Sequence, residues 1–369
     1  MVDLEKFLTS QDAKELFFVS VENKNGIGGI ERLVADLHKQ LNKNKITENI
    51  FYLSKNKKTH KFFAKSISRR IILFWRTFEL LFFICLKLIK YRNRKIVILF
   101  FHSECHVIQY RLRKVFYRFN RVSTVTYLCQ SPILYPKRLL EYGRQAAISS
   151  DFIWSYSGAV ARMWEPLIDR AVSSIWNPVD IDRIKRVVFT ESHSKSILKF
   201  IHVGRPVKFK SPEKSLEFAI LTAQFVQSVK LTFVGLSHLA NIDKYKIPPN
   251  LEIEYKGLVL DPLVLVADST AMLSFGDFES AGEVLGISAL ESLCLGVPVC
   301  VENLNHTDFK NLPGIYTSEE FFKKIPKNRG EPHDWNLRYH ISHKQVEDLR
   351  NKLSSERYLG EIIDKLNLG

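Results

Sequence analysis

Two glutamates near residue 290 are the side chains with the clearest chemical use. Glu283 and Glu291 stand eight residues apart, with a glycine turn between them and a predicted helix that begins at Ile287. A carboxylate accepts hydrogen bonds from the vicinal hydroxyls of a ribose or a hexose. The backbone N–H groups of Ile287 and Ser288, at the start of the helix, bind phosphate oxygens. We interpret this stretch as a sugar-phosphate site; the alternative is a surface helix with ordinary glutamates.

Two further stretches carry glycine or basic residues directly after a predicted strand. Arg205 and Lys210 follow Gly204, and a guanidinium beside an ammonium suits the two negative charges of a diphosphate. Gly28 and Gly29 stand between a strand and a helix, where glycine lets the backbone approach a ligand closely. The alternatives are a solvated basic loop for the first stretch and a ligand-free tight turn for the second.

The elements that must position these residues alternate short apolar runs with amphipathic stretches, a pattern typical of stacked βαβ units. A polar stretch at 181–197 separates two series, so we expect an N-terminal Rossmann-like domain at 1–180 and a C-terminal nucleotide-sugar-binding domain at 198–343, followed by a helix at 344–369. Ligands bind at the carboxyl ends of strands in such sheets. The predicted strands are Leu16–Val21, Ile50–Leu53, Lys95–Phe101, Val122–Leu128, Phe152–Tyr156, Ser173–Trp176, Leu198–Val203, Lys230–Val234, Leu251–Tyr255, Thr270–Phe275 and Pro298–Glu302. The predicted helices are 30–41, Ile71–Ile89, Pro212–Ser228, Ile287–Leu295 and Lys344–Lys365.

The excess positive charge belongs to one segment of the chain. The net charge is +15, and residues 55–121 hold 18 Lys and Arg against two Glu, a balance of +16, so the remainder sums to −1. Such a field attracts anionic lipid, phosphorylated acceptors or nucleic acid. Phe62–Phe63, Phe74–Trp75 and Leu80–Leu86 make the segment too apolar for an arm that tracks phosphates. We therefore expect an anionic membrane surface as the partner, and no nucleic acid.

Within this segment, Ile71–Ile89 is long enough to span a bilayer, but Arg76, Glu79 and Lys87 interrupt it. We favour a helix that lies in the membrane interface, with a soluble helix covered by its own domain as the alternative. The flanking cations would then reach lipid phosphates; they are Lys65, Arg69, Arg70, Lys90, Arg92 and Arg94. The N-terminal residues lack the pattern of a signal peptide, and five scattered cysteines without zinc spacing suit a reducing cytosol.

Taken together, these stretches resemble glycosyltransferase family 4, a large retaining group with the GT-B fold. Glu283 and Glu291 followed by Gly296-Val297-Pro298-Val299 match its Glu-x7-Glu and Gly-x-Pro-Val. Gly204-Arg205 with Lys210 matches its Gly-Arg-x4-Lys, and Gly28–Arg32 its first-loop glycines. Asn177–Asp180 resembles its Asn-Gly-Val-Asp. The order and spacing hold over residues 16–300.

The resemblance implies an α/β fold of GT-B type, in which two Rossmann-like domains face each other across a cleft and the C-terminal helix returns towards the first domain. It implies that Arg205 and Lys210 bind the donor diphosphate, Glu291 the ribose and Glu283 the donor sugar. It also implies that no metal or other cofactor is needed, since the basic pair and the helix amides stabilise the leaving diphosphate. The expected donor-binding residues are Gly28, Gly29, Arg205, Lys210, Glu283, Ile287, Ser288 and Glu291, with Glu283, Arg205 and Lys210 catalytic.

The sequence departs from the family pattern at several positions. Glu279 begins Glu-Ser-Ala-Gly, which also resembles the family's Glu-Ser-Phe-Gly, so it competes with Glu283 for the sugar. Cys129-Gln130-Ser131 stands where many members carry a histidine. His102 is an alternative contact for acceptor or sugar, although a histidine that ends a strand is often structural. The region after Glu302 matches the family poorly.

The function that follows is a retaining hexosyltransferase using a nucleotide-diphosphate sugar, UDP- or GDP-linked. Its acceptor would be a lipid-linked or surface-polysaccharide or lipopolysaccharide glycan at the cytosolic membrane face, with the protein cytoplasmic and peripheral. The alternative is a GT-B-like nucleotide-binding protein without transferase activity, epimerase-like or a non-catalytic partner subunit.

Overall fold

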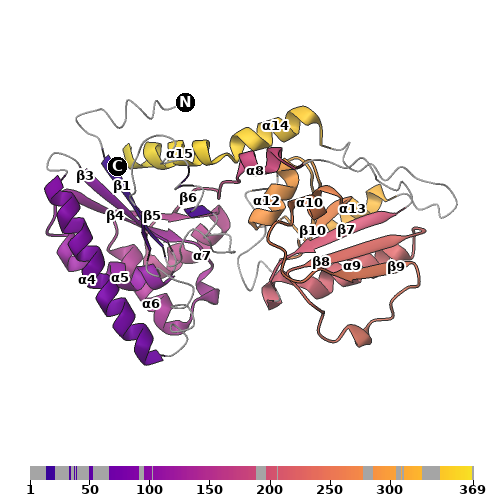
Figure 1. The fold of residues 1–369 in the computed structure, drawn as a ribbon, viewed down its shortest axis with the longest axis horizontal. Coiled ribbons are helices and arrows are strands. Elements are labelled where there is room, and N and C mark those ends of the chain that lie inside the picture. Colours follow the sequence, from indigo (N-terminus) through magenta and orange to yellow (C-terminus); the bar gives the residue numbers. More distant parts are fainter. Residues whose placement is uncertain are drawn as a thin grey trace. The chain divides into compact units, whose positions relative to one another are not determined.

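The chain divides into two compact units in the computed structural model (Figure 1). The first unit joins Met1–Asn177 with Ser355–Gly369, and the second is Pro178–Ser354. The structure describes residues 14–20, 33–34, 37, 39, 50–52, 66–90, 95–101, 103–187, 197–205, 207–276, 286–304, 309, 311–325 and 341–367.

The first unit is built on a six-stranded parallel sheet with the order β2-β1-β3-β4-β5-β6. Phe18 of β1 pairs with Ile50 of β2 on one side and with Leu99 of β3 on the other. Strand β3 is buried at every position after Lys95, as its continuous apolar run predicts for a strand covered on both faces. The strands are β1 Lys14–Ser20, β2 Ile50–Tyr52, β3 Lys95–Phe100, β4 Val122–Leu128, β5 Phe152–Ser155 and β6 Ser173–Ser174.

Helices cover both faces of this sheet. Alternate strand residues such as Phe17 and Ile98 pack against α4 and α5, and Phe18 and Leu99 face the opposite way. On that second face lie Tyr358, Leu359, Ile362 and Leu366 of the terminal helix α15. The expected return of the C-terminal helix to the first domain is therefore confirmed. The helices of this unit are α4 Ser66–Lys90, α5 Ser103–Phe116, η1 Pro132–Leu134, α6 Lys137–Ile148, α7 Gly158–Ile168 and α15 Ser355–Asn367.

The second unit is also built on a six-stranded parallel sheet, with the order β12-β11-β10-β7-β8-β9. Phe200 and Leu231 on its strands pack against Leu216 of α9 and Phe321 of α13 in one apolar core. The strands are β7 Leu198–Val203, β8 Val229–Val234, β9 Leu251–Tyr255, β10 Ala271–Leu273, β11 Val299–Val301 and β12 Ile315–Thr317. The helices are α8 Ile181–Lys185, η2 Lys208–Lys210, α9 Pro212–Ala223, η3 Ile242–Lys244, α10 Leu263–Ala267, α12 Ile287–Cys294, α13 Ser318–Lys324 and α14 His343–Lys352.

Strand order reverses once in each sheet. In the second unit the chain runs outward from β7 to β9, then returns to β10 on the other side of β7. In the first unit the corresponding reversal lies between β1 and β3. Ligands of doubly wound sheets bind where the order reverses, outside the carboxyl ends of the strands. The topology therefore marks the ends of β7 and β10 as a place to look for a site.

The C-terminal segment differs from the expectation of one helix over Lys344–Lys365, because it forms α14 and α15. The helix is interrupted at Leu353 and Ser354, where the N–H of Val179 donates to the carbonyl of Leu353 at 2.8 Å and Val179 forms a β-bridge with Ser354. The helical spacing of apolar residues does not predict a contact of this kind. None of the helices in the described ranges combines the length and hydropathy of a membrane-spanning segment.

Candidate functional site

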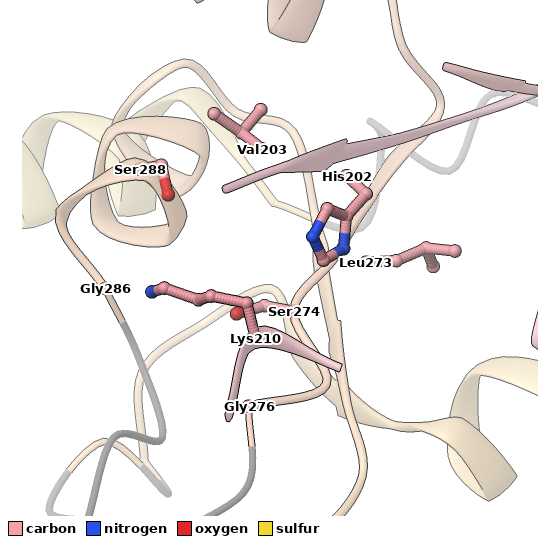
Figure 2. Close-up of a pocket in the computed structure, with 8 residues that line it drawn as sticks. All are labelled: His202, Val203, Lys210, Leu273, Ser274, Gly276, Gly286 and Ser288. Atoms are coloured by element: carbon pink, nitrogen blue, oxygen red, sulfur yellow. The ribbon is translucent and has the colours of Figure 1, made fainter. Parts of the chain in front are cut away.

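A pocket lies at the carboxyl ends of β7 and β10, on either side of the strand-order reversal (Figure 2). Strand β7 contributes its last residues, the loop after β10 contributes a hydroxyl, η2 contributes a lysine, and α12 presents its first turn. The lining residues are His202, Val203, Lys210, Leu273, Ser274, Gly276, Gly286 and Ser288.

The turn after β7 places Lys210 at the pocket. The N–H of Gly204 donates to the carbonyl of Val234 at 3.0 Å, and a β-carbon on Gly235 would lie 2.1 Å from the carbonyl oxygen of Gly204. The two strand ends therefore touch backbone to backbone. Ser211 then takes a left-handed conformation with φ of 47°, and α9 begins at the next residue. The Lys210 side chain extends across the pocket in Figure 2.

Helix α12 points its N-terminus at the same pocket. It runs for eight residues from Ile287, and its N-cap residue Gly286 provides no side-chain hydrogen bond to the first turn. The first N–H groups of a helix have no acceptor within the helix, and the helix dipole adds partial positive charge there. Residues from Ala289 to Cys294 are buried and fix the helix in place. Together with the Lys210 ammonium, these groups favour an anion.

His202 is a pocket residue that the sequence analysis missed. It is 2% exposed, and its Nδ1 lies 2.9 Å from the hydroxyl oxygen of Ser215 on α9. Burial, with a smaller contribution from the positive charge of Lys210, lowers the pKa of His202 to about 3. The imidazole is therefore neutral at physiological pH. A histidine within an apolar strand reads as part of the core, so the sequence offered no signal for it.

Glu291 is held by an arginine that the sequence analysis also missed. The Nη1 of Arg183 donates to Oε1 of Glu291 at 2.6 Å, while Nε and Nη2 donate to the two carboxylate oxygens of Asp261 at 3.2 and 2.7 Å. Asp180 starts the short helix α8 by accepting from the N–H of Arg183 at 3.0 Å. Glu291 itself is 2% exposed. It lies three residues along α12 from Ser288, on the same helix face as that pocket residue.

The residues expected from sequence fall into three groups. Lys210 and Ser288 line the pocket, and Ile287 is the first residue of α12. Arg205 is exposed after β7, and Glu291 is buried against Arg183 rather than lining the pocket. Five candidates lie outside the described residues: Gly28, Gly29, His102, Glu279 and Glu283.

In the sequence, Gly28 and Gly29 come after β1 and His102 comes after β3, and these two strands lie beside the reversal in the first unit. In the part of the chain that the structure describes, no three His, Cys, Asp or Glu side chains gather where they could hold a metal ion.

The sequence of the chain matches no protein-family model and no curated protein. Solved structures, however, are similar over nearly its whole length. HepE from Anabaena, solved in complex with UDP and glucose, has a TM-score of 0.62 at 13% identity, covering 96% of this chain and 99% of that one. Sucrose-phosphate synthase from Thermosynechococcus elongatus has a TM-score of 0.60 at 11% identity, and the match covers 95% of this chain and 99% of that one. An alpha-glucosyltransferase in complex with UDP and a 13-mer DNA has a TM-score of 0.55 at 15% identity, and the match covers 96% of this chain and 99% of that one.

These similarities define the fold. The chain is an α/β protein with two parallel-sheet Rossmann-like units, and its structural neighbours are GT-B glycosyltransferases. The expected fold class is therefore confirmed.

Proposed function

We propose that the chain is a retaining glycosyltransferase that transfers a sugar of the hexose type from a nucleotide-diphosphate donor. One observation carries the proposal: the strand-order reversal of the second unit brings Lys210 and the N-terminus of α12 to a single pocket. That pocket is built for an anionic oxygen, and a nucleotide-diphosphate sugar offers one at its reacting end. The UDP complexes of HepE and the alpha-glucosyltransferase support a donor of this class.

In this proposal, the pocket stabilises charge on the leaving group. Lys210, Arg205 and the amides of Ile287 and Ser288 bind the diphosphate and lower the energy of the charge that develops as its bond to the sugar breaks. The acceptor hydroxyl attacks the anomeric carbon on the face from which the diphosphate departs, and the oxygen of the departing diphosphate takes the hydroxyl proton. The anomeric configuration is therefore retained. Because these groups supply the electrostatic stabilisation, we propose that no metal or other cofactor takes part.

The two glutamates take separate roles. Glu291 accepts hydrogen bonds from the ribose hydroxyls of the donor, and Arg183 orients its carboxylate through the 2.6 Å contact to Oε1. Glu283 accepts from the hydroxyls of the sugar, with Glu279 as the alternative residue for that contact. Gly28 and Gly29 let the first loop approach the leaving phosphate, and His102 contacts the acceptor or the sugar.

Turnover separates this proposal from the alternative, a GT-B-like protein that binds nucleotide without transferring sugar. We expect the purified protein to release UDP or GDP from the matching nucleotide sugar. Alanine at Glu283 or at Glu291 should remove most of that release, and alanine at Glu279 should not. NMR of the product should show the donor's anomeric configuration. Nucleotide binding without turnover on any offered acceptor would favour the alternative, and inverted product would contradict retention.

The location of the acceptor is proposed from helix α4. This 25-residue helix, about 37 Å long by its rise per residue, buries Leu80, Ile84 and Leu88 in the first unit. Its opposite face is also apolar, and large side chains there are 49–70% exposed. They are Phe74, Trp75, Phe78, Phe82, Leu86 and Ile89. A contiguous exposed patch of this kind marks an interaction surface.

The charge of the same region favours a lipid surface as the occupant. The segment 55–121 carries a balance of +16, and Arg111, Lys114 and Arg118 on and after α5 are exposed. Basic residues around an exposed aromatic stripe suit the interface of an anionic bilayer. We therefore propose that the protein is cytoplasmic and peripheral, docks on the inner membrane face through α4, and glycosylates a lipid-linked or surface-polysaccharide or lipopolysaccharide acceptor.

Vesicle cosedimentation tests the docking proposal. We expect the protein to bind phosphatidylglycerol-containing vesicles more strongly than phosphatidylcholine vesicles at physiological salt. The double variant Phe78→Ser/Phe82→Ser should lose about tenfold or more in partitioning, because each ring contributes about 1 kcal/mol or more when it is buried in lipid. The control is Leu258→Ser/Leu260→Ser, which changes two exposed side chains of the second unit. Equal binding by both double variants, or preference for duplex DNA over vesicles, would contradict the proposal.

A further inference from the structure

The side chain of His202 presents a buried nitrogen to the pocket. His202 is 2% exposed, and among the residues that the structure describes its Nε2 has no hydrogen-bond partner. A β-carbon on Gly204 would lie 3.2 Å from that nitrogen and 3.4 Å from Cγ of Lys210. Figure 2 shows the ring, the Lys210 side chain and Ser288 around the same pocket. A buried polar atom of this kind costs free energy unless a ligand satisfies it.

The other ring nitrogen of His202 contacts a serine hydroxyl. Ser215 is fully buried, and its hydroxyl lies 2.9 Å from Nδ1 of His202. A serine hydroxyl can take either role in this contact, and we assign the hydroxyl as donor and Nδ1 as acceptor. A neutral imidazole with an accepting Nδ1 carries its proton on Nε2. With this assignment, His202 offers an N–H donor to the pocket.

The remaining groups of the pocket have the same polarity. The Lys210 ammonium and the first amides of α12 are hydrogen-bond donors, the Ser274 and Ser288 hydroxyls can donate, and among the residues that the structure describes no carboxylate lines the pocket. Because burial and the Lys210 charge keep the imidazole neutral, His202 adds directionality without adding charge. Several hydrogen-bond donors that point at one place, without a negatively charged acceptor among the described residues, select an anionic oxygen rather than a cation or a sugar hydroxyl.

We propose that Nε2–H of His202 donates a hydrogen bond to a phosphate oxygen of the bound nucleotide diphosphate. Ser215 is a positioning residue, because its hydroxyl holds the ring in the tautomer and orientation that this contact needs. The inference rests on the proposed function, which puts the diphosphate in this pocket. His202, which lies in the core of the sheet, thus adds a neutral N–H donor to the cationic and backbone donors of Lys210 and α12.

Calorimetry with matched ligands tests the contact. The probes are UDP, GDP, TDP and ADP, and for the one that binds best, its nucleoside without phosphates. We expect His202→Phe to weaken binding of the diphosphate about tenfold or more, as for the loss of a hydrogen bond to a charged group, and to leave nucleoside binding unchanged. His202→Gln, which keeps an N–H donor, should recover part of the loss, and Ser215→Ala should weaken diphosphate binding to a smaller degree.

His238→Phe is the matched control. Its Nδ1 also lies beside a serine hydroxyl, that of Ser237 at 3.2 Å, but both residues are exposed and outside the pocket. If the wild-type protein binds none of the four diphosphates, both the inference and the proposed function are wrong. If the wild-type protein binds one of them and His202→Phe binds it as well as His238→Phe does, the inference alone is wrong.

A measurement on the wild-type protein covers the case in which His202→Phe does not fold. With ¹⁵N-labelled histidine, we expect the saturating diphosphate to shift the Nε2–H resonance of one buried histidine and to couple it to ³¹P. Ser215→Ala should perturb that resonance, which identifies it as His202. A bound diphosphate that leaves all histidine resonances unchanged would overturn the inference.

Discussion

At the scale of single residues, Arg183 joins three elements of the second unit. Its guanidinium contacts Glu291 of α12 at 2.6 Å and both carboxylate oxygens of Asp261, which precedes α10, at 2.7 and 3.2 Å. Burial opposes the charged form, but the hydrogen bonds and charges of Asp261 and Glu291 outweigh it and raise the pKa of Arg183. The arginine therefore stays charged and holds the carboxylate of Glu291 in one orientation.

Removing Arg183 should destabilise the second unit. Arg183→Ala leaves the nearly buried carboxylate of Glu291 without its arginine, and breaking such a pair costs about 3 kcal/mol. Lys230→Ala, which breaks pairs with the more exposed Glu252 and Glu254, should cost about 1 kcal/mol or less. Urea unfolding measures both free energies. Equal losses for the two variants would contradict the buried role of Arg183.

His202 should make stability depend on pH. The pKa of this residue is about 3 in the folded chain and about 6.5 in an unfolded one. Between those values the unfolded state binds a proton that the folded state excludes, so the free energy of unfolding falls as pH falls, by up to about 1.4 kcal/mol per pH unit. As the pH falls from 6.5 to 4, the free energy of unfolding of the wild type should therefore decrease more than that of His202→Phe. Parallel urea-unfolding profiles across that range would contradict the low pKa.

Lys210 should affect turnover far more than a neighbouring lysine does. If Lys210 stabilises the leaving diphosphate, Lys210→Ala should lower kcat/KM about 100-fold or more. Lys214, four residues on, pairs with Glu302 and does not line the pocket. Lys214→Ala should stay within about twofold of wild type in the same nucleotide-release assay. Similar losses of kcat/KM for both variants would show that turnover depends on the overall positive charge of this region rather than on a specific contact of Lys210.

The sequence predicted only part of the candidate site. Lys210 and Ser288 were named from a basic loop and a helix start, and the structure brings both to one pocket. His202 was not predictable, because its chemistry comes from burial and from a serine thirteen residues on. Arg183 lies in a stretch that reads as a polar linker, and its carboxylate partners are 78 and 108 residues away. Contacts over such separations leave no local pattern.

At the scale of elements, the ends of β7 and β8 meet at Gly235. It has φ of 96°, and an added β-carbon would strike the carbonyl of Gly204 at 2.1 Å. Gly257 also has a positive φ, of 58°, but nothing lies within 4 Å of its β-carbon position. Both positions have a positive φ that favours glycine, but only Gly235 also needs glycine for space.

The two glycines make a matched pair of variants. Gly257→Ala should cost about 1–2 kcal/mol, the strain of a left-handed residue. Gly235→Ala should cost clearly more, because it also separates the strand ends, and it should weaken nucleotide binding through Gly204 and Lys210. Urea unfolding and calorimetry measure the two effects. A Gly235→Ala protein as stable as Gly257→Ala would show that the strand ends do not need to touch.

Three strands were predicted with the bounds that the structure shows, and they are Val122–Leu128, Leu198–Val203 and Leu251–Tyr255. The first two are mostly buried, whereas the third is an edge strand in which only Leu251 is buried. Boundaries shifted where a turn ended the element early: the helix predicted over Pro212–Ser228 ends at Ala223, and the strand predicted over Ser173–Trp176 ends at Ser174.

At the scale of the whole molecule, the two sheets share a parallel architecture and differ in strand order. Of the strands that the structure describes, two precede the reversal in the first sheet (β1 and β2) and three precede it in the second (β7, β8 and β9). The alternation of apolar runs predicted two α/β units, but strand order depends on which neighbours pair, which no single run encodes. The return of α15 to the first unit came from the family resemblance. The structure explains it by the burial of Tyr358, Leu359 and Ile362 against the first sheet.

The measurement closest to the central claim is thermal stabilisation by UDP, GDP, TDP and ADP, with and without EDTA. A metal-independent diphosphate site predicts that one nucleotide raises the melting temperature selectively and that EDTA leaves the rise unchanged. At 100 times its Kd, the nucleotide should add about 2.7 kcal/mol of stability. No rise with any of the four at millimolar concentration would contradict the site, and a rise that EDTA abolishes would contradict its independence of metal.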